Sequence, residues 1–152
     1  MRLAEALILR ADIQKRIEQL RLRIVRNAKV QDGDKPAEDP NKLLQELQEI
    51  TSNLEVLVQR INRTNAGTDF GNGKTVADVI ATRDRLKLLQ NIYRELAKEG
   101  TITQTRYSKS EVKFKSSVNV AEIQKQADTF AKEYRKLDTE IQTINWDTEL
   151  VE

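Results

Sequence analysis

The segment from Pro40 to Ile61 constrains the fold of this chain more than any other. Its apolar side chains are spaced alternately by four and three residues, in the order Leu43, Leu47, Ile50, Leu54, Leu57 and Ile61. This is the a/d pattern of a heptad helix, and no polar residue interrupts it. Such a narrow apolar stripe has to be buried against other helices. The segment therefore predicts a helix over about 40–63 inside a helical bundle.

Three further segments have the apolar spacing of helices, at about 3–28, 75–99 and 119–145. The first has a heptad seam of Leu3, Ala6, Ile13, Ile17, Leu20 and Ile24, which Arg10 and Asn27 interrupt. The segment 75–99 has an apolar face of Val76, Val79, Ile80, Leu86, Leu89, Ile92, Tyr93 and Leu96. The segment 119–145 has a second clean seam of Ile123, Ala127, Phe130, Tyr134, Leu137, Ile141 and Ile144. These patterns favour coiled-coil-type packing among the helices.

Local signals set the expected boundaries. Asp39 suits the N-cap of the second helix and Pro40 its first position, and Asn119 suits the N-cap of the fourth. The segments 31–39 and 62–74 are rich in turn-forming residues and read as connections. Gly71-Asn72-Gly73-Lys74-Thr75 lacks the phosphate-loop spacing, because Thr68 stands where a glycine is needed.

Between the third and fourth helices, residues 101–118 alternate β-branched or aromatic residues with polar ones. They predict a β-ribbon with strands at about 101–107 and 111–118. A two-stranded ribbon is marginal alone, so it would lie on the bundle or pair with a ribbon of another subunit.

The predicted fold is mainly α: an elongated antiparallel bundle of four long helices with heptad seams, plus this β-ribbon. We expect a single domain over residues 1–152. A long, thin bundle cannot bury all its apolar side chains, so we expect a homo-oligomer that associates through the first helix, the ribbon or both.

Composition excludes several chemistries. The chain contains no Cys and no His, which rules out cysteine nucleophiles, Ser–His triads and the usual zinc sites. Charged residues make up 33% of the chain, yet the net charge is only +2, which argues against a dedicated polyanion binder. No cofactor or metal site is expected. No segment resembles a membrane span or a signal peptide, so we expect a cytoplasmic protein.

The favoured function is a non-enzymatic structural or interaction protein with an unknown protein partner. Its contacts are expected from loops and ends, where rigid scaffolds display function. The candidate partner-binding residues are Asn62, Arg63, Thr64, Asn65, Arg106, Tyr107, Lys109, Lys113 and Trp146.

Two alternatives remain open. A nucleic-acid-binding module could use the basic ribbon or the basic half of the first helix, which contains Lys15, Arg16, Arg21, Arg23, Arg26 and Lys29. An enzyme would need either a small-molecule pocket near the Gly-rich segment 62–74 or carboxylates that hold a divalent ion, of the kind represented by Glu46, Glu49, Asp84 and Glu95.

Three short runs carry a resemblance to a known family. They are Ile61-Asn62-Arg63-Thr64-Asn65, Arg106-Tyr107-Ser108-Lys109-Ser110-Glu111-Val112-Lys113 and Ile144-Asn145-Trp146. In these runs the chain resembles the small bacterial proteins known as septicolysins, over nearly its whole length. The resemblance implies an oligomeric helical bundle of undefined role. The family name also implies a pore-forming cytolysin as a further alternative, although the chain has no Cys for thiol activation.

Overall fold

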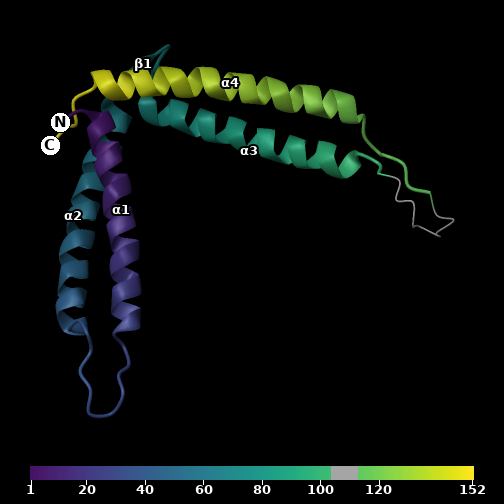
Figure 1. The fold of residues 1–152 in the computed structure, drawn as a ribbon. Coiled ribbons are helices and arrows are strands. Elements are labelled where there is room, and N and C mark those ends of the chain that lie inside the picture. The colour runs from purple at the N-terminus through teal and green to yellow at the C-terminus, as the bar shows by residue number, and fades with distance from the viewer. Residues whose placement is uncertain (104–112) are drawn as a thin grey trace. The chain divides into compact units, whose positions relative to one another are not determined.

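The computed structural model describes residues 1–103 and 113–152. These residues form four α-helices: α1 (Leu3–Arg26), α2 (Pro40–Gly67), α3 (Val76–Gly100) and α4 (Val120–Asp147). Two short strands, β1 (Asp69–Gly71) and β2 (Lys74–Thr75), lie between α2 and α3 (Figure 1). The prediction of a mainly helical protein with four long helices is confirmed.

Contacts between residues divide the chain into two compact units. The first unit comprises Met1–Val76 and Thr143–Glu152, and the second comprises Ala77–Gln142. The first unit is built on the hairpin of α1 and α2, and the second on the hairpin of α3 and α4 (Figure 1). Nothing in this division tests the expectation of a single domain, which stays a prediction.

The core of the first unit follows the predicted seams of α1 and α2. Its buried members are Leu3, Ala6, Ile13, Leu20, Leu43, Ile50, Leu57, Ile61 and Leu150. Leu47 and Leu54, the other two seam residues of α2, are partly buried against this core. The two interruptions of the α1 seam, Arg10 and Asn27, are partly exposed. Leu150 adds an apolar side chain from the C-terminal tail, which the seam analysis did not include.

Asp39 and Pro40 start α2 as predicted. The Asp39 side chain accepts a hydrogen bond from the Asn41 backbone N–H at 3.0 Å, and Pro40 occupies the first turn. Asn119 caps α4 in the same way, since its side-chain oxygen accepts from the Glu122 backbone N–H at 3.2 Å.

The end of α2 differs from the prediction. The sequence predicted a break from Asn62, whereas the helix continues to Gly67. Thr64 and Thr68 donate their hydroxyls to the carbonyl oxygens of Arg60 and Thr64, at 2.8 and 2.7 Å. These hydroxyls bond back along the helix, an arrangement that is compatible with helix, instead of forming turns.

The ribbon also differs from the prediction. The observed strands β1 and β2 pair antiparallel between α2 and α3, with positive φ angles at Gly71, Asn72 and Gly73. The sequence placed the ribbon between the third and fourth helices instead. Residues 101–103 and 113–118 form no strand, and residues 104–112 lie outside the described part of the chain. Three consecutive residues with positive φ produce a tight turn, for which glycine and asparagine are well suited.

The face that α3 buries is narrower than the sequence predicted. Of the predicted apolar face, Val76, Val79, Ile80, Leu86, Leu89 and Tyr93 are buried or partly buried, and so are Thr82, Arg83, Gln90, Ala97 and Gly100. Ile92 and Leu96, which we expected on the apolar face, are 49% and 38% exposed. The polar residues Arg83 and Gln90 thus occupy positions on the buried side of α3, where the apolar pattern alone does not predict them.

The seam of α4 is buried largely as predicted. Ala127 and Ile141 are buried, and the other predicted seam residues are partly buried. The ring of Tyr93 on α3 meets that of Phe130 on α4 edge to face, with centroids 5.0 Å apart. The Lys87 ammonium lies 5.2 Å from the centroid of the Tyr134 ring, within cation–π range.

The two hairpins start with the same pattern. The run Leu3-Ala4-Glu5-Ala6-Leu7-Ile8-Leu9-Arg10 of α1 corresponds to Val76-Ala77-Asp78-Val79-Ile80-Ala81-Thr82-Arg83 of α3. In both runs an apolar seam residue comes first, an acid third and an arginine eighth. The seams stay in register beyond these runs, since Ile13 corresponds to Leu86 and Leu20 to Tyr93. Side chains at corresponding positions of α1 and α3 can therefore be compared directly.

Candidate functional site

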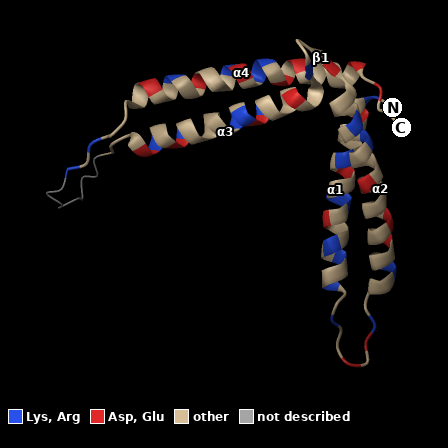
Figure 2. Ribbon diagram, turned by 180° about the vertical axis from the view of Figure 1, so that it is seen from behind, with Lys and Arg blue, Asp and Glu red and all other residues tan. Residues whose placement is uncertain are grey.

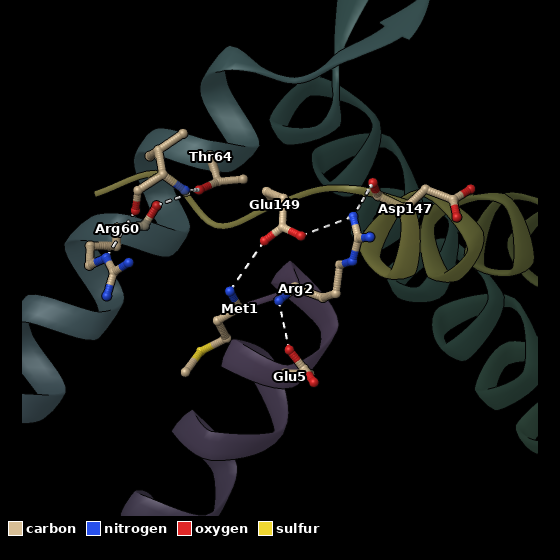
Figure 3. A network of polar contacts seen from close by, with 8 residues as sticks. Met1, Arg2, Glu5, Arg60, Thr64, Asp147 and Glu149 are labelled. Atoms are coloured by element: carbon tan, nitrogen blue, oxygen red, sulfur yellow. Dashed lines mark hydrogen bonds and ion pairs between the residues drawn. The ribbon is translucent and has the colours of Figure 1, made fainter.

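The densest polar cluster of the first unit joins three chain segments. They are Met1, Arg2 and Glu5 at the start of the chain, Arg60, Arg63 and Thr64 on α2, and the tail from Asp147 to Glu152 (Figure 3). We call these residues the terminal network.

Backbone pairing connects the start of the chain to the tail. Arg2 and Glu149 form an antiparallel β-bridge. The Leu3 N–H donates to the Thr148 carbonyl, and the Leu150 N–H donates to the Met1 carbonyl, both at 2.9 Å. This pairing fixes the direction of the tail and places Leu150 in the core of the hairpin.

The last turns of α2 bind the same tail. The Arg60 Nε donates to the Val151 carbonyl at 2.9 Å, and the Val151 N–H donates to the Thr64 hydroxyl at 3.1 Å. Arg63 reaches the carbonyl of Glu152 with Nη1 at 3.4 Å. Thr64 is only 1% exposed, so its hydroxyl works inside the protein, where it accepts from the tail and donates to Arg60.

Charge pairs lie on the outside of this network. Glu149 contacts the amino group of Met1 and the guanidinium of Arg2, each at 3.2 Å. Arg2 also donates to the Asp147 carbonyl at 3.1 Å. These side chains are 40–62% exposed, so water screens their attraction and each pair stabilises the tail only modestly.

Two buried amides belong to the same unit. The side-chain oxygens of Asn65 and Asn145 are buried and accept no hydrogen bond from the described part of the chain. Asn145 is only 3% exposed. The next residue, Trp146, differs sharply from it, because 53% of Trp146 is exposed. The last turn of α4 therefore buries an amide and presents a large aromatic ring to solvent.

The structure places five of the candidate partner-binding residues in the first unit. Asn62, Arg63, Thr64 and Asn65 lie on the last turns of α2, and Trp146 lies on the last turn of α4, all in the first unit. Asn62 and Arg63 are exposed, and Asn65 is partly exposed. Lys113 is exposed in a segment without regular secondary structure, whereas Arg106, Tyr107 and Lys109 lie outside the described residues.

Sequence reasoning missed the residues that organise the tail. Arg2, Arg60, Glu149 and Val151 act mainly through backbone groups or from positions that look like ordinary charged surface. The sequence contains no regular signal for them, because Glu149-Leu150-Val151-Glu152 does not alternate between polar and apolar residues as a strand does.

The basic half of α1 is partly paired with acids of the same chain. Arg21 binds Glu18, and Arg23 binds Glu38 of the connection between α1 and α2. These bonds lower the pKa of both glutamates and raise the pKa of both arginines. Lys15 lies 4.0 Å from Asp12. Each of the four helices carries both acidic and basic residues (Figure 2).

In residues 1–103 and 113–152, no three Asp or Glu side chains gather closely enough to hold a metal ion. None of the helices formed by these residues combines the length and the apolar character needed to cross a membrane.

The structure thus defines a protein of two helical hairpins. The N-terminal and C-terminal segments of its chain pair with each other in the first unit. Residues 10–150 match a family described as "Family of unknown function (DUF6847)", and the chain belongs to that family. It is similar to a solved structure described as a functionally unknown conserved protein from Corynebacterium diphtheriae. The two chains are 48% identical, 99% of each is covered, and the TM-score is 0.90. No curated protein matches the chain. None of these comparisons bears on the resemblance to septicolysins.

Proposed function

We propose that this protein is a non-enzymatic helical scaffold, homo-oligomeric and cytoplasmic, that binds a protein partner through a surface centred on Trp146. The observation that supports this most directly is the 53% exposure of Trp146. Tryptophan is enriched among the residues that dominate binding energy at protein interfaces.

The surroundings of Trp146 suit a binding surface. The tail that follows it is bound to the start of the chain and to α2, so a partner would meet a segment that is already ordered. Pre-ordering reduces the entropy that binding has to overcome. Exposed Asn62 and Arg63 would supply polar contacts from α2 in the same unit.

The second region in this proposal is the segment with Arg106, Tyr107, Lys109 and Lys113. Its support is the sequence alone, since it combines cations with one aromatic side chain. The relationship to septicolysins is also kept as a proposal on the three sequence runs that carry it.

Affinity capture with the full chain tests the proposal. Wild-type protein, Trp146→Ala and Arg63→Ala would be compared, with Val56→Ala as the matched control. Val56 is an apolar residue of the same unit, is 55% exposed and does not belong to the terminal network. We expect proteins recovered with wild type and Val56→Ala to be lost with Trp146→Ala and reduced with Arg63→Ala. Equal recovery with all four proteins would refute this binding surface.

A further inference from the structure

The second unit carries an apolar surface that its own hairpin does not cover. Leu88, Ile92 and Leu96 are spaced by four residues, so they lie on one side of α3. They are 60%, 49% and 38% exposed. A different side of the helix, with Leu86, Gln90, Tyr93 and Ala97, is buried or partly buried in the hairpin. We call Leu88, Ile92 and Leu96 the α3 stripe.

The first hairpin shows that the architecture does not require apolar residues at these positions. In the correspondence between α1 and α3, the α3 stripe matches Lys15, Gln19 and Arg23 of α1. All three are polar or charged, and all three are exposed. An apolar surface at positions that are polar in the matching helix indicates a contact surface of the second hairpin.

Two charges flank the α3 stripe symmetrically. Arg85 precedes Ile92 by seven residues and Glu99 follows it by seven, which is two helical turns in each direction. Both residues are exposed, and within the described part of the chain neither takes part in an ion pair. The same face of α3 thus has a positive end, an apolar centre and a negative end.

This arrangement of charges and apolar residues is complementary to a second copy of itself in antiparallel orientation. We propose that the α3 stripe is the contact surface between two copies of this chain, which pair antiparallel about a two-fold axis at Ile92. The two Ile92 side chains meet at the axis, and Leu88 of each copy faces Leu96 of the other. Arg85 of each copy faces Glu99 of the other, so the ion pair forms twice, as an isologous interface requires.

A parallel pair of α3 helices would lack this complementarity. It would place Arg85 opposite Arg85 and Glu99 opposite Glu99, and both like-charge contacts oppose association. The charges therefore specify the direction of pairing, while the apolar centre supplies the driving force.

The inference rests on the homo-oligomeric part of the proposed function and assigns it a surface. The sequence suggested association through the first helix, the ribbon or both, whereas the inferred contact surface lies on α3.

Exchange of charges tests the inference on the full chain. Arg85→Glu leaves Glu opposite Glu99, and Glu99→Arg leaves Arg opposite Arg85, so each variant alone has two repulsive contacts. A mixture of the two variants has two attractive ones, because one copy carries only Glu at these positions and the other only Arg. We expect each variant to weaken association at least about tenfold and the equimolar mixture to restore it.

The molar mass of wild type, single variants and mixture would be measured by sedimentation over the micromolar range. Lys98→Glu is the matched control, since it changes the net charge as Arg85→Glu does but lies off the α3 stripe. Ile92→Lys is a second variant, which places two like charges at the axis and abolishes association. Circular dichroism checks that every variant stays helical, as expected for exposed positions.

The outcomes separate the inference from the proposed function. Association that persists unchanged in Arg85→Glu, Glu99→Arg and Ile92→Lys overturns the α3 surface but leaves a homo-oligomeric scaffold. Single variants that stay dissociated after mixing overturn the antiparallel pairing. A strictly monomeric wild-type chain overturns both the inference and the oligomeric part of the proposal, whereas binding through Trp146 is decided by the capture experiment.

Discussion

Arg83 of α3 donates a hydrogen bond from Nη1 to Oδ1 of Asp138 on α4, at 3.0 Å and across 55 positions of sequence. Arg83 lies in the seam of the second hairpin, where burial by itself would lower its pKa. Its bonds to Asp84 and Asp138 outweigh burial and raise the pKa above the ordinary value of arginine. The pair therefore lets a charged residue occupy a seam position, and it connects the two helices laterally.

Loss of this pair should destabilise the second hairpin. We expect Arg83→Ala and Asp138→Ala each to lower the free energy of unfolding by about 1–2 kcal/mol, because each leaves a partly buried partner without its counterpart. Urea unfolding measures the change.

The double variant shows whether the effect belongs to the pair. Arg83→Ala with Asp138→Ala should cost less than the sum of the two single changes. Asp84→Ala is the control: the Asp84 side chain is 64% exposed and pairs with the same arginine, so its loss should have little effect. Additive costs for Arg83 and Asp138 would contradict the coupling.

The connection between α1 and α2 should make stability sensitive to acid. The Arg23 guanidinium donates from Nε to Glu38 Oε2 at 3.1 Å and lowers the pKa of Glu38 in the folded protein. A carboxyl with a lowered folded pKa stabilises the protein above its unfolded pKa of about 4.3. That contribution is lost as the pH falls through the lowered folded value.

Melting temperatures of wild type and Glu38→Gln test this prediction between pH 7 and pH 3. We expect the wild type to be more stable near neutrality and the two proteins to converge at the acidic end. The difference should also shrink at high salt, because the pair is exposed. A difference that grows on acidification would contradict the assigned sign.

The Thr64 hydroxyl should hold the C-terminal tail. Thr64→Val keeps the shape of the side chain but leaves the Val151 N–H without its acceptor, which costs about 1–2 kcal/mol. Hydrogen exchange of the Val151 amide should become faster, and unfolding should require less urea. Thr51→Val is the matched control on the same helix, since the Thr51 hydroxyl bonds only to carbonyls of its own helix, Leu47 and Gln48. Equal effects of the two changes would contradict a specific role for Thr64.

The seam that sequence predicted most directly is built from apolar residues alone. Leu43 to Ile61 has no polar interruption, and the structure buries it as the spacing requires. The seam of α3 could not be read in this way, because Arg83 is accommodated by Asp138 far away in the sequence. Ile92 and Leu96 were wrongly assigned to the seam of α3 because they are apolar. Hydropathy alone does not show whether an apolar residue faces the core or the solvent.

The candidate site was only partly accessible to sequence. Runs of Asn, Arg and Thr marked the end of α2 as unusual, and the structure places them beside the tail. Their conformation was misjudged, because the same side chains suit turns and also bond back to a helix. The backbone pairing of Arg2 with Glu149 could not be foreseen, since it depends on main-chain groups that every residue carries.

Trp146 offers a direct optical test of the surface proposed for partner binding. It is the only tryptophan of the chain, so the intrinsic fluorescence reports on this position alone. With 53% of the residue exposed, we expect emission typical of a hydrated indole and efficient quenching by acrylamide.

Trp146→Ala should lower the free energy of unfolding by less than about 1 kcal/mol, because little packing is lost at an exposed position. Val79→Ala, which truncates a side chain of the second hairpin that is only 3% exposed, provides the comparison and should cost more. Blue-shifted emission with weak quenching, together with a large loss of stability in Trp146→Ala, would instead identify the ring as a core element at the end of α4. The binding surface would then have to be sought elsewhere on the first unit.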